Sequence, residues 1–371
     1  MRQLMLKPQI HMYPICADFV ADFNFGKGDL IITNEYIYKP FFSAFSLECD
    51  VLYQEKYGAG EPSDEMAEAI FADIKRPINR IIAIGGGTVI DLAKLYVLKN
   101  VTPIIDLFDK KLEFVKDKSL IVVPTTCGTG SEVTNISILE IKSRQTKMGL
   151  AVDELYPDSA ILIPELLCTL PYHFFATSSI DALIHAAESY VSPKATHYTR
   201  LLASDAINTI IKGYQAIESD GKDARAEWFE DFLVASNLAG VAFGNAGVGA
   251  VHAMSYPLSG KYHVAHGEAN YALFTRVFDE YNSISQHGWI AALTYKLGTL
   301  LHSTSGDKVF SDLAALLDSI LPLKKLREYG VTEADIPDFT ANVMEKQGRL
   351  TANNWVPLDT GRVAAIYRDL L

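Results

Sequence analysis

The segment Ile81-Ile-Ala-Ile-Gly-Gly-Gly-Thr-Val-Ile-Asp-Leu-Ala-Lys94 places a strand-like apolar run directly before three glycines and a helix-like run. Glycines let the backbone approach a ligand closely, and N–H groups at the start of a helix attract phosphate oxygens. The spacing differs from the common fingerprint G-x-G-x-x-G, because Ile90 stands at the third glycine position. The pattern predicts a strand–turn–helix unit whose turn is either a phosphate-binding loop or a plain tight turn.

Strand-like and helix-like segments alternate throughout the N-terminal half. A buried strand is expected from Asp29 to Asn34, and another, Ser119-Leu-Ile-Val-Val, runs into Pro124-Thr-Thr-Cys-Gly-Thr-Gly-Ser-Glu. This alternation is typical of a parallel sheet with covering helices, which binds ligands at the carboxyl ends of its strands. Glycine-rich loops after two buried strands favour one shared nucleotide site more than either loop does separately. The second loop alone would favour a polar turn. Neither loop carries the Gly-Lys-Ser/Thr sequence of an ATPase.

The pattern changes near Leu162-Ile-Pro-Glu-Leu-Leu, beyond which only helices are expected. Long amphipathic segments follow at Ser178–Tyr190, Thr199–Gln215 and Arg225–Ala246. We therefore predict an α/β nucleotide-binding domain over residues 1–162 and an α-helical domain over residues 163–371. The length of 371 residues agrees with two domains, because a single hydrophobic core rarely grows beyond about 250–300 residues.

Four side chains of the helical half have the types and the spacing of metal ligands. Asp181 and His185 are four residues apart in a predicted helix and therefore share one face. His252 and His266 follow on two later helical segments. One carboxylate and three imidazoles form a plausible site for a divalent cation. The alternative is that each histidine is a hydrogen-bonded core residue, which is the commoner role for an isolated one.

The helices around these histidines are expected to have definite ends. His252 should lie near the end of a helix of small residues, Leu238–Val251, that Pro257 terminates. His266 should begin the next helix. Glu188, on the Asp181 face, is interpreted as a supporting or packing residue rather than a fifth ligand.

The bulk composition argues against several classes of partner. The net charge is −12, with 33 basic and 45 acidic residues, whereas nucleic acids and anionic membranes bind basic surfaces. The apolar runs have the length of strands and are too short to cross a bilayer. The N-terminus lacks the apolar segment of a signal peptide, and no two cysteines have C-x-x-C spacing. We expect a cytoplasmic protein with no nucleic-acid or membrane partner. The predicted metal site leaves room for an oxygen of a small-molecule substrate.

Several motifs together resemble those of the iron-dependent (group III) alcohol dehydrogenases. They are, in order, Gly85-Gly-Gly-Thr…Asp91…Lys94, Pro124-Thr-Thr…Gly128-Thr-Gly-Ser-Glu, Asp181-Ala-Leu-Ile-His-Ala…Glu188, and His252…His266-Gly. The resemblance covers almost all of the chain. It implies the dehydroquinate-synthase-like fold, with a Rossmann-like parallel-sheet domain followed by a helical metal-binding domain. It also implies an oxidoreductase that acts on a CH–OH group with NAD(P) and forms a homodimer or larger homo-oligomer.

The resemblance also implies roles for individual residues. The metal positions of the family correspond to Asp181, His185, His252 and His266. Its nicotinamide-cofactor positions correspond to Gly86, Gly87, Thr88, Asp91, Thr125, Thr126, Thr129 and Lys147. Fe(II) follows from the resemblance, whereas the ligand set alone would suit Zn(II) equally well.

Within the family the chain is most similar to the branch that interconverts 4-hydroxybutyrate and succinic semialdehyde with NAD(H). The markers are Gly28-Asp-Leu-Ile-Ile-Thr-Asn-Glu-Tyr and Tyr262-His-Val-Ala-His-Gly, together with the chain length. The alternative on the same scaffold is a general primary-alcohol or diol dehydrogenase. A carbon–oxygen lyase of the dehydroquinate-synthase type and a non-catalytic metal-binding protein are the alternatives from other classes.

The chain departs from the family pattern at two positions. Many members carry an aspartate at the end of the early strand, where it binds the adenosine ribose and repels a 2′-phosphate, but this chain has Asn34. NADP is therefore not excluded as the cofactor. Many members also carry a proton-relaying histidine four residues after the third metal ligand, where this chain has Tyr256. Either Tyr256 or His263 takes that task, or solvent reaches the alcohol oxygen directly.

A carboxylate substrate should require a cation, because a buried unpaired carboxylate is costly. Lys261, between the two later histidines, is our hypothesis for this cation, and a surface lysine is the alternative interpretation. Lys142 and Arg144 are rival cations at the tip of a β-hairpin expected over residues 136–151.

Overall fold

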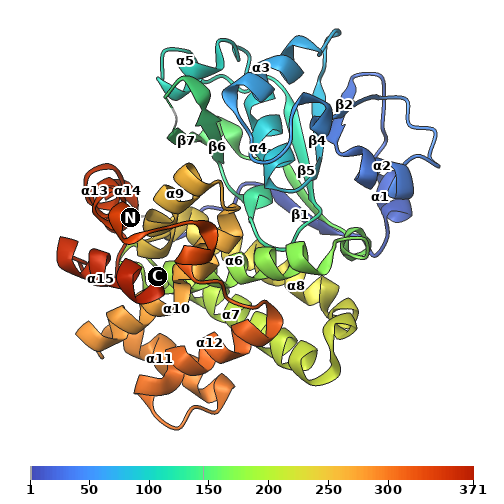
Figure 1. Ribbon diagram of the computed structural model, residues 1–371. Helices are drawn as coiled ribbons and strands as arrows, with labels where there is room; N and C mark the ends of the chain where they lie inside the picture. The colour runs from blue at the N-terminus through green and yellow to red at the C-terminus, as the bar shows by residue number, and fades with distance from the viewer. Residues whose placement is uncertain (1, 145) are drawn as a thin grey trace. The chain divides into compact units, whose positions relative to one another are not determined.

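The structure is a computed structural model that describes residues 2–144 and 146–371. The chain packs into two compact units, an α/β unit (Leu6–Leu170) and a helical unit (Met1–Met5 and Pro171–Leu371). The α/β unit thus extends beyond residue 162, because Leu166 of a short 3-10 helix (Pro164–Leu167) belongs to the hydrophobic core around the sheet. Figure 1 shows both units as ribbons.

The α/β unit contains a six-stranded parallel sheet in the order β1-β8-β5-β4-β2-β3. The strands are β1 (Gln9–Met12), β2 (Asp29–Thr33), β3 (Asp50–Tyr53), β4 (Arg80–Gly85), β5 (Ser119–Pro124) and β8 (Ser159–Leu162). After β2 the chain adds β3 on one side, and then β4, β5 and β8 on the other side. The strand order therefore reverses between β2 and β4. Such a switch point is where open parallel sheets bind their ligands.

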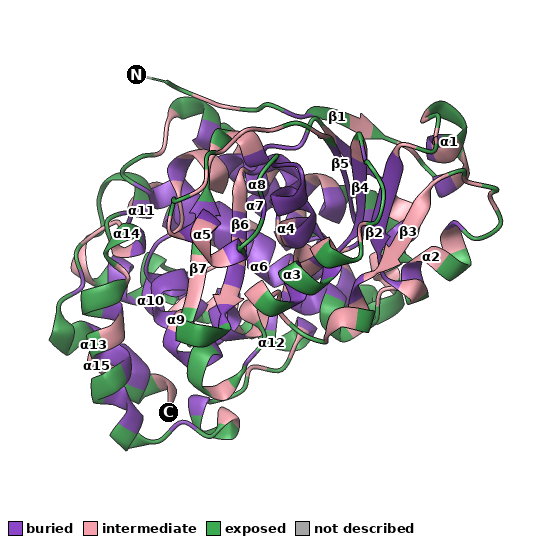
Figure 2. Cartoon of the chain, turned by 90° about the horizontal axis from the view of Figure 1, so that it is seen from above, coloured by how far each residue is buried: buried purple, intermediate pink, exposed green. Residues whose placement is uncertain are grey.

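Both faces of this sheet are buried, which explains why its strands are continuous apolar runs. Successive side chains of a strand point to opposite faces, so Ile81 and Ala83 enter one core while Ile82 and Ile84 enter the other. In Figure 2 the strands β2, β4 and β5 are accordingly coloured as buried.

Helices cover the two faces of the sheet. Residues of α3 (Asp64–Ala72), α4 (Gly87–Tyr96) and α5 (Ile104–Phe108) join one core, and residues of α1 (Cys16–Asp22) and α2 (Glu35–Phe41) join the other. The Ser63 hydroxyl caps α3 by accepting from the Met66 amide at 3.2 Å. The predicted hairpin is present as β6 (Ile136–Ile141) and β7 (Thr146–Ala151), which pair antiparallel.

Within residues 171–371, as the structure describes them, all regular secondary structure is helical, as expected. They are α6 (Tyr172–Val191), α7 (His197–Asp220), α8 (Phe229–Ala246), α9 (Ala250–Tyr262), α10 (His266–Ile284), α11 (Gly288–Leu301), α12 (Val309–Ile320), α13 (Ile336–Lys346), α14 (Gly348–Thr351) and α15 (Thr360–Leu370), with short 3-10 turns between some of them. α6 packs against α7, α8, α10 and α11. Its buried residues surround the helix, which is the pattern of a core helix rather than a surface helix.

The expected helix over Leu238–Val251 is wrong, because the chain breaks between α8 and α9. Gly247 has φ +77°, a left-handed conformation that glycine adopts without strain. A Cβ at Gly247 would also lie 2.5 Å from the Asn353 amide nitrogen, which donates to the Val248 carbonyl at 2.9 Å. His252 therefore lies in the first turn of α9 and not at the end of a long helix.

The expected stop at Pro257 is also wrong, because this proline lies inside α9. The loss of one backbone donor is outweighed by burial of the residues around it, including Met254 and Leu258, both 0% exposed. Among the described residues no single helix is long and apolar enough to span a membrane. One pair, Lys222–Ala246 and Ala250–Tyr262, bent by 100°, meets the length and composition test only when taken together.

Candidate metal and nucleotide sites

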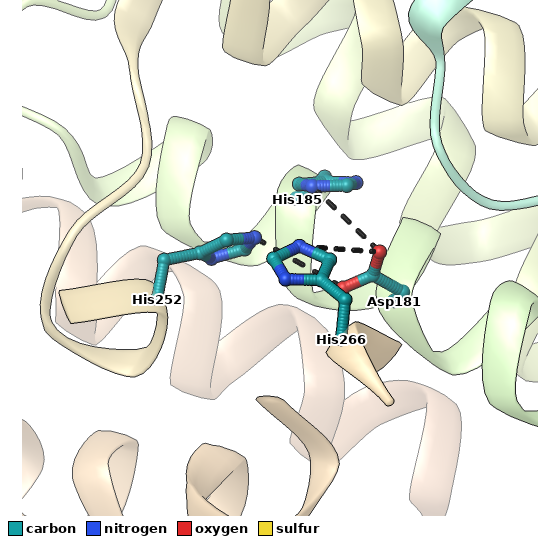
Figure 3. Close-up of side chains that lie close together, drawn as sticks. All are labelled: Asp181, His185, His252 and His266. Atoms are coloured by element: carbon teal, nitrogen blue, oxygen red, sulfur yellow. Dashed lines mark ion pairs between the residues drawn. The ribbon is translucent and has the colours of Figure 1, made fainter. Parts of the chain in front are cut away.

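The helical unit brings the four predicted metal ligands together. Asp181 and His185 lie on α6, His252 on α9 and His266 on α10, and one potential ligand atom from each lies within 4.8 Å of the others. Figure 3 shows the three imidazoles arranged around the Asp181 carboxylate. The Asp181 oxygens lie 3.9 Å from Nε2 of His185, 3.9 Å from Nε2 of His266 and 4.0 Å from Nε2 of His252. All are buried except His266, whose side chain is 33% exposed.

A glycine next to the fourth ligand makes this convergence possible. Gly267 follows His266 at the start of α10, and a Cβ there would lie 2.8 Å from the Thr177 carbonyl oxygen of α6. Only a residue without a side chain permits this approach of the two backbones. Gly267 therefore brings the first turn of α10 close enough to α6 for His266 to reach Asp181.

Glu188 fixes the orientation of the His252 ring. Its Oε2 lies 2.6 Å from His252 Nδ1, and its Oε1 accepts from the Val251 amide at 2.7 Å. Burial opposes protonation of His252, but the charge and hydrogen bond of Glu188 outweigh it and raise the pKa of the imidazole. His252 Nε2 is buried without a hydrogen-bond partner. An imidazole nitrogen with no protein partner, beside a carboxylate, fits a metal ligand.

Asn270 is a further residue of this cluster that the sequence analysis missed. Its Nδ2 donates to Asp181 Oδ1 at 2.8 Å and lies 3.1 Å from His266 Nε2. The available signal was its position four residues after His266, which puts both on one face of α10. Burial raises the pKa of Asp181, but His185, His266, His252 and the Asn270 hydrogen bond together lower it. The donor set is therefore one ionised carboxylate and three imidazoles, which suits Fe(II) or Zn(II).

The α/β unit brings the two glycine-rich loops together at the ends of β4 and β5. Gly85 pairs with Pro124 in the register of these strands. A Cβ at Gly87 would lie 3.1 Å from Thr129 Cγ2, and one at Gly86 would lie 3.5 Å from Thr126 Cγ2. The Thr125 amide donates to the Gly85 carbonyl at 3.1 Å. Because Gly86 and Gly87 have no side chains, the two loops can approach each other this closely, and their backbone N–H groups stay accessible to a diphosphate.

Asp91 and Lys94 connect α4 to the chain that follows β5. Asp91 accepts from the Ser131 hydroxyl at 2.6 Å and from the Ile138 amide at 3.0 Å. Lys94 Nζ donates to Ser131 Oγ at 2.8 Å and to the Ile136 carbonyl at 2.7 Å. Burial raises the pKa of Asp91 and lowers that of Lys94 to about 8. Both side chains therefore hold the second loop against α4.

The remaining predicted cofactor residues have protein partners in the α/β unit. The Thr88 hydroxyl donates to the Gly60 carbonyl at 3.2 Å, and Lys147 forms an ion pair with Glu61. Asn34, directly after β2, donates through Nδ2 to Glu55 at 3.0 Å and to Gln54 at 3.1 Å.

The three residues predicted to act on the substrate all come from α9 and its end. Tyr256 is half-buried on α9, and His263 is an exposed C-cap residue with φ +54°. Lys261 forms an ion pair with Asp335, which also accepts from the Tyr262 hydroxyl at 2.8 Å. The Lys261 hydrogen bond, with those from Thr332, holds the pKa of Asp335 well below its usual range. The structure thus gives Lys261 a protein carboxylate as its partner.

Two family profiles match the chain. The profile of the iron-containing alcohol dehydrogenases matches residues 17–164, and that of the C-terminal part of the Fe-containing alcohol dehydrogenase family matches residues 175–371. The 4-hydroxybutyrate dehydrogenase of Clostridium kluyveri is 49% identical over 371 residues, which is 100% of both chains. Long-chain-alcohol dehydrogenase 1 of Geobacillus thermodenitrificans is 34% identical over 304 residues, covering 77% of this chain and 73% of the relative.

Solved structures share the fold. The sulfoacetaldehyde reductase of Bifidobacterium kashiwanohense, solved in complex with NAD+, superimposes with a TM-score of 0.86 at 23% identity, covering 100% of this chain and 98% of the other. A 1,3-propanediol oxidoreductase superimposes with a TM-score of 0.81 at 24% identity over 100% of both chains. The expected fold is thereby confirmed, and with the profiles and the full-length relative it follows that this chain belongs to the iron-containing alcohol dehydrogenase family.

Proposed function

We propose that this enzyme interconverts 4-hydroxybutyrate and succinic semialdehyde with NAD(H). The observation that carries the proposal is the 49% identity to a 4-hydroxybutyrate dehydrogenase over the full length of both chains. A general primary-alcohol dehydrogenase is the second candidate, because a relative at 34% identity acts on long-chain alcohols.

We assign the metal to Asp181, His185, His252 and His266. The unpartnered His252 Nε2 and the ionised Asp181 support this assignment, because both are ligand atoms that a divalent cation would satisfy. When bound, the cation supplies Lewis acidity toward an alcohol oxygen and the nicotinamide ring supplies a hydride acceptor. Glu188 and Asn270 orient His252 and Asp181 for this role through the hydrogen bonds described above.

We assign NAD binding to the loops after β4 and β5, with Asn34 beside them at the end of β2. The residues are Asn34, Gly86, Gly87, Thr88, Asp91, Thr125, Thr126, Thr129 and Lys147. The absence of side chains at Gly86 and Gly87, where the two loops meet, supports this assignment, because a diphosphate can approach the bare backbone closely. Asp91 contributes by holding the Ser131 loop in place, through its bond to the Ser131 hydroxyl. Lys147 would exchange Glu61 for a cofactor oxygen.

We assign proton transfer to the Tyr256 hydroxyl or to the His263 imidazole, since both belong to the segment between the third and fourth ligands. Tyr256 lies four residues after His252 on α9 and therefore shares its face. The variants Tyr256→Phe and His263→Ala distinguish these two possibilities. The residue that transfers the proton is the one whose loss flattens an arm of the pH profile of kcat.

We assign binding of the substrate carboxylate to Lys261, whose side chain is 52% exposed and can exchange Asp335 for the substrate. Lys142 and Arg144 likewise form ion pairs, with Glu140 and Asp109. Lys261 is preferred because it lies in the segment between the third and fourth metal ligands. A cytoplasmic homodimer or larger homo-oligomer completes the proposal, and light scattering of the purified protein tests the number of copies.

One anaerobic assay tests the proposed reaction. The protein is loaded with Fe(II) or Zn(II) and given NAD or NADP with 4-hydroxybutyrate, 1-butanol, 1,2-propanediol or 1,3-propanediol. We expect NADH to accumulate fastest with 4-hydroxybutyrate. Equal kcat/KM for 1-butanol would favour the general alcohol dehydrogenase, and substrate turnover without accumulation of NADH would favour a lyase of the dehydroquinate-synthase type. Absence of metal and cofactor binding would favour a non-catalytic protein.

A further inference from the structure

The sheet topology marks the place at which an adenosine ribose would bind. The strand order reverses between β2 and β4, and Asn34 and Gly86 are the first residues after these two strands. In sheets of this type the diphosphate lies on the glycine-rich turn, and an acidic residue at the end of a neighbouring strand bonds the ribose hydroxyls. The residue that follows β2 is here the neutral Asn34. The expected negative charge is therefore missing from this position.

The segment that follows β3, the strand next to β2, supplies a negative charge. β3 is hydrogen-bonded to β2 with Thr33 opposite Tyr53, and a 3-10 helix (Gln54–Tyr57) follows β3 directly. Its Glu55 lies with Oε2 3.0 Å from Asn34 Nδ2 and with Oε1 2.6 Å from the Glu35 amide nitrogen. Two donors in the residues directly after β2, the Asn34 side-chain amide and the Glu35 backbone amide, thus fix the Glu55 carboxylate at the end of that strand. Each carboxylate oxygen can accept a further hydrogen bond.

The Asn34 amide is already oriented by this contact. Its Nδ2 donates to both Glu55 and Gln54, so its nitrogen is occupied by protein acceptors. The two nearby lysines also have other partners, since Lys39 pairs with Glu35 at 3.2 Å and Lys56 Nζ lies over the Tyr53 ring at 4.8 Å. Glu55 is thus the carboxylate that bonds directly to Asn34 and to the Glu35 amide, whereas the Glu35 carboxylate pairs with Lys39.

We propose that Glu55 is the specificity-determining residue that selects NAD over NADP, accepting a hydrogen bond from the adenosine ribose and repelling a 2′-phosphate. The inference rests on the proposed NAD-dependent function and assigns its cofactor selectivity to a residue outside β2. A 2′-phosphate carries a charge of about −1.5 to −2 at neutral pH, so placing it beside an ionised carboxylate is unfavourable. Asn34 acts as a positioning residue, because its Nδ2 holds the Glu55 carboxylate that would bond the ribose.

The test is direct binding of cofactors to Glu55→Gln. Glutamine keeps the size of the side chain and an oxygen that accepts from the Glu35 amide. Its NH2 group replaces the oxygen that accepts from Asn34 Nδ2, so the charge and this one hydrogen bond are removed. Kd values for NAD, NADP, 5′-AMP and 2′,5′-ADP are measured by calorimetry on the metal-loaded enzyme. We expect the ratio of the NADP and NAD Kd values to fall by about tenfold or more, with the same change between 2′,5′-ADP and 5′-AMP.

Matched variants separate this role from a general charge effect. Glu35→Gln removes a carboxylate one residue from Asn34, but that carboxylate pairs with Lys39, and we expect no change in the ratio. Glu55→Ser removes the charge together with bulk and should admit NADP even if the glutamine variant does not fold. An unchanged ratio in a folded Glu55 variant, or an equal change in Glu35→Gln, would overturn the inference.

The outcome for the unmodified protein distinguishes this inference from the proposed function. If the protein binds NAD and oxidises 4-hydroxybutyrate while Glu55→Gln keeps its cofactor ratio, only the role of Glu55 is wrong. If the unmodified protein binds neither NAD nor NADP, the proposed function fails and the inference fails with it.

Discussion

Glu188 and His252 form a buried pair in which the carboxylate lies 2.6 Å from Nδ1 and leaves Nε2 without a hydrogen-bond partner. Such a carboxylate fixes the tautomer and the ring orientation of a metal-binding imidazole. We expect Glu188→Gln to weaken metal affinity by about 10–100-fold. The measurement is competition with a chromogenic chelator. Glu280→Gln, another buried glutamate of the helical unit that pairs with Arg276 and Arg362, should leave metal affinity unchanged.

Removal of the metal should lower the stability of the helical unit. The ligands come from α6, α9 and α10, so an ion bound by the folded chain alone adds free energy of unfolding that grows with its concentration. At a free metal concentration of about 100 times Kd this amounts to about 2.7 kcal/mol. Thermal unfolding with and without a chelator measures the effect. In His266→Ala the chelator should shift Tm far less, and an equal shift in both proteins would exclude this site as the cause.

Gly87→Ala should raise the Kd for NAD while lowering the free energy of unfolding only slightly. The new methyl group would lie 3.1 Å from Thr129 Cγ2, a contact that small shifts relieve, but it would cover part of the backbone proposed to bind the diphosphate. We expect the NAD Kd to rise by about tenfold, measured by quenching of protein fluorescence. Gly26→Ala is the control, because a Cβ there has no atom within 4 Å. Equal affinity in the two variants would show that the diphosphate lies elsewhere.

Lys261→Met should reduce kcat/KM for 4-hydroxybutyrate while sparing 1-butanol. The reason is that only the first substrate carries a carboxylate that needs the ammonium group. A loss of about 1.5–3 kcal/mol in transition-state binding is expected for a hydrogen bond to a charged group. Asp335→Asn breaks the same ion pair from its other side but retains Lys261. If both variants lose activity equally on both substrates, Lys261 is a structural partner of Asp335.

The pH dependence of stability should report the buried ammonium of Lys94. Burial lowers its folded-state pKa from 10.5 to about 8, so between these values the unfolded chain binds more protons than the folded chain. The cost of burying the charge is therefore fully present below pH 8 and disappears as the pH rises toward 10.5. Relative to Lys94→Met, the protein should gain on the order of 1–3 kcal/mol over this range. Urea unfolding at several pH values measures this gain, and a constant difference would contradict it.

The sequence predicts the fold well wherever a local pattern also determines packing. The apolar runs at Ile81 and Leu120 became central strands because both faces of the sheet are covered. The i, i+4 spacing of Asp181 and His185 likewise placed both on one helical face. The convergence of His252 and His266 with this pair, which was predicted from the types and spacing of the four side chains, is present in the structure.

Other features depend on contacts that sequence spacing does not reveal. The break at Gly247 is matched by Asn353, which lies far along the chain, so a helical pattern across residues 238–251 was misleading. Pro257 was expected to stop a helix, but burial of α9 outweighs the local penalty. Asn270 was missed because its partner Asp181 is remote in sequence. The pairing of Glu55 with Asn34 needs the order of the strands, which alternation alone does not determine.

The break between α8 and α9 has a consequence for biosynthesis. A nascent chain carries Asp181 and His185 well before His266 has been made, and Asn353, which holds the junction that precedes His252, is added later still. No partial translation product that ends before His266 can present all four ligands. Binding of a metal by the complete proposed ligand set therefore comes late in synthesis, after the segment that carries His266 has been added.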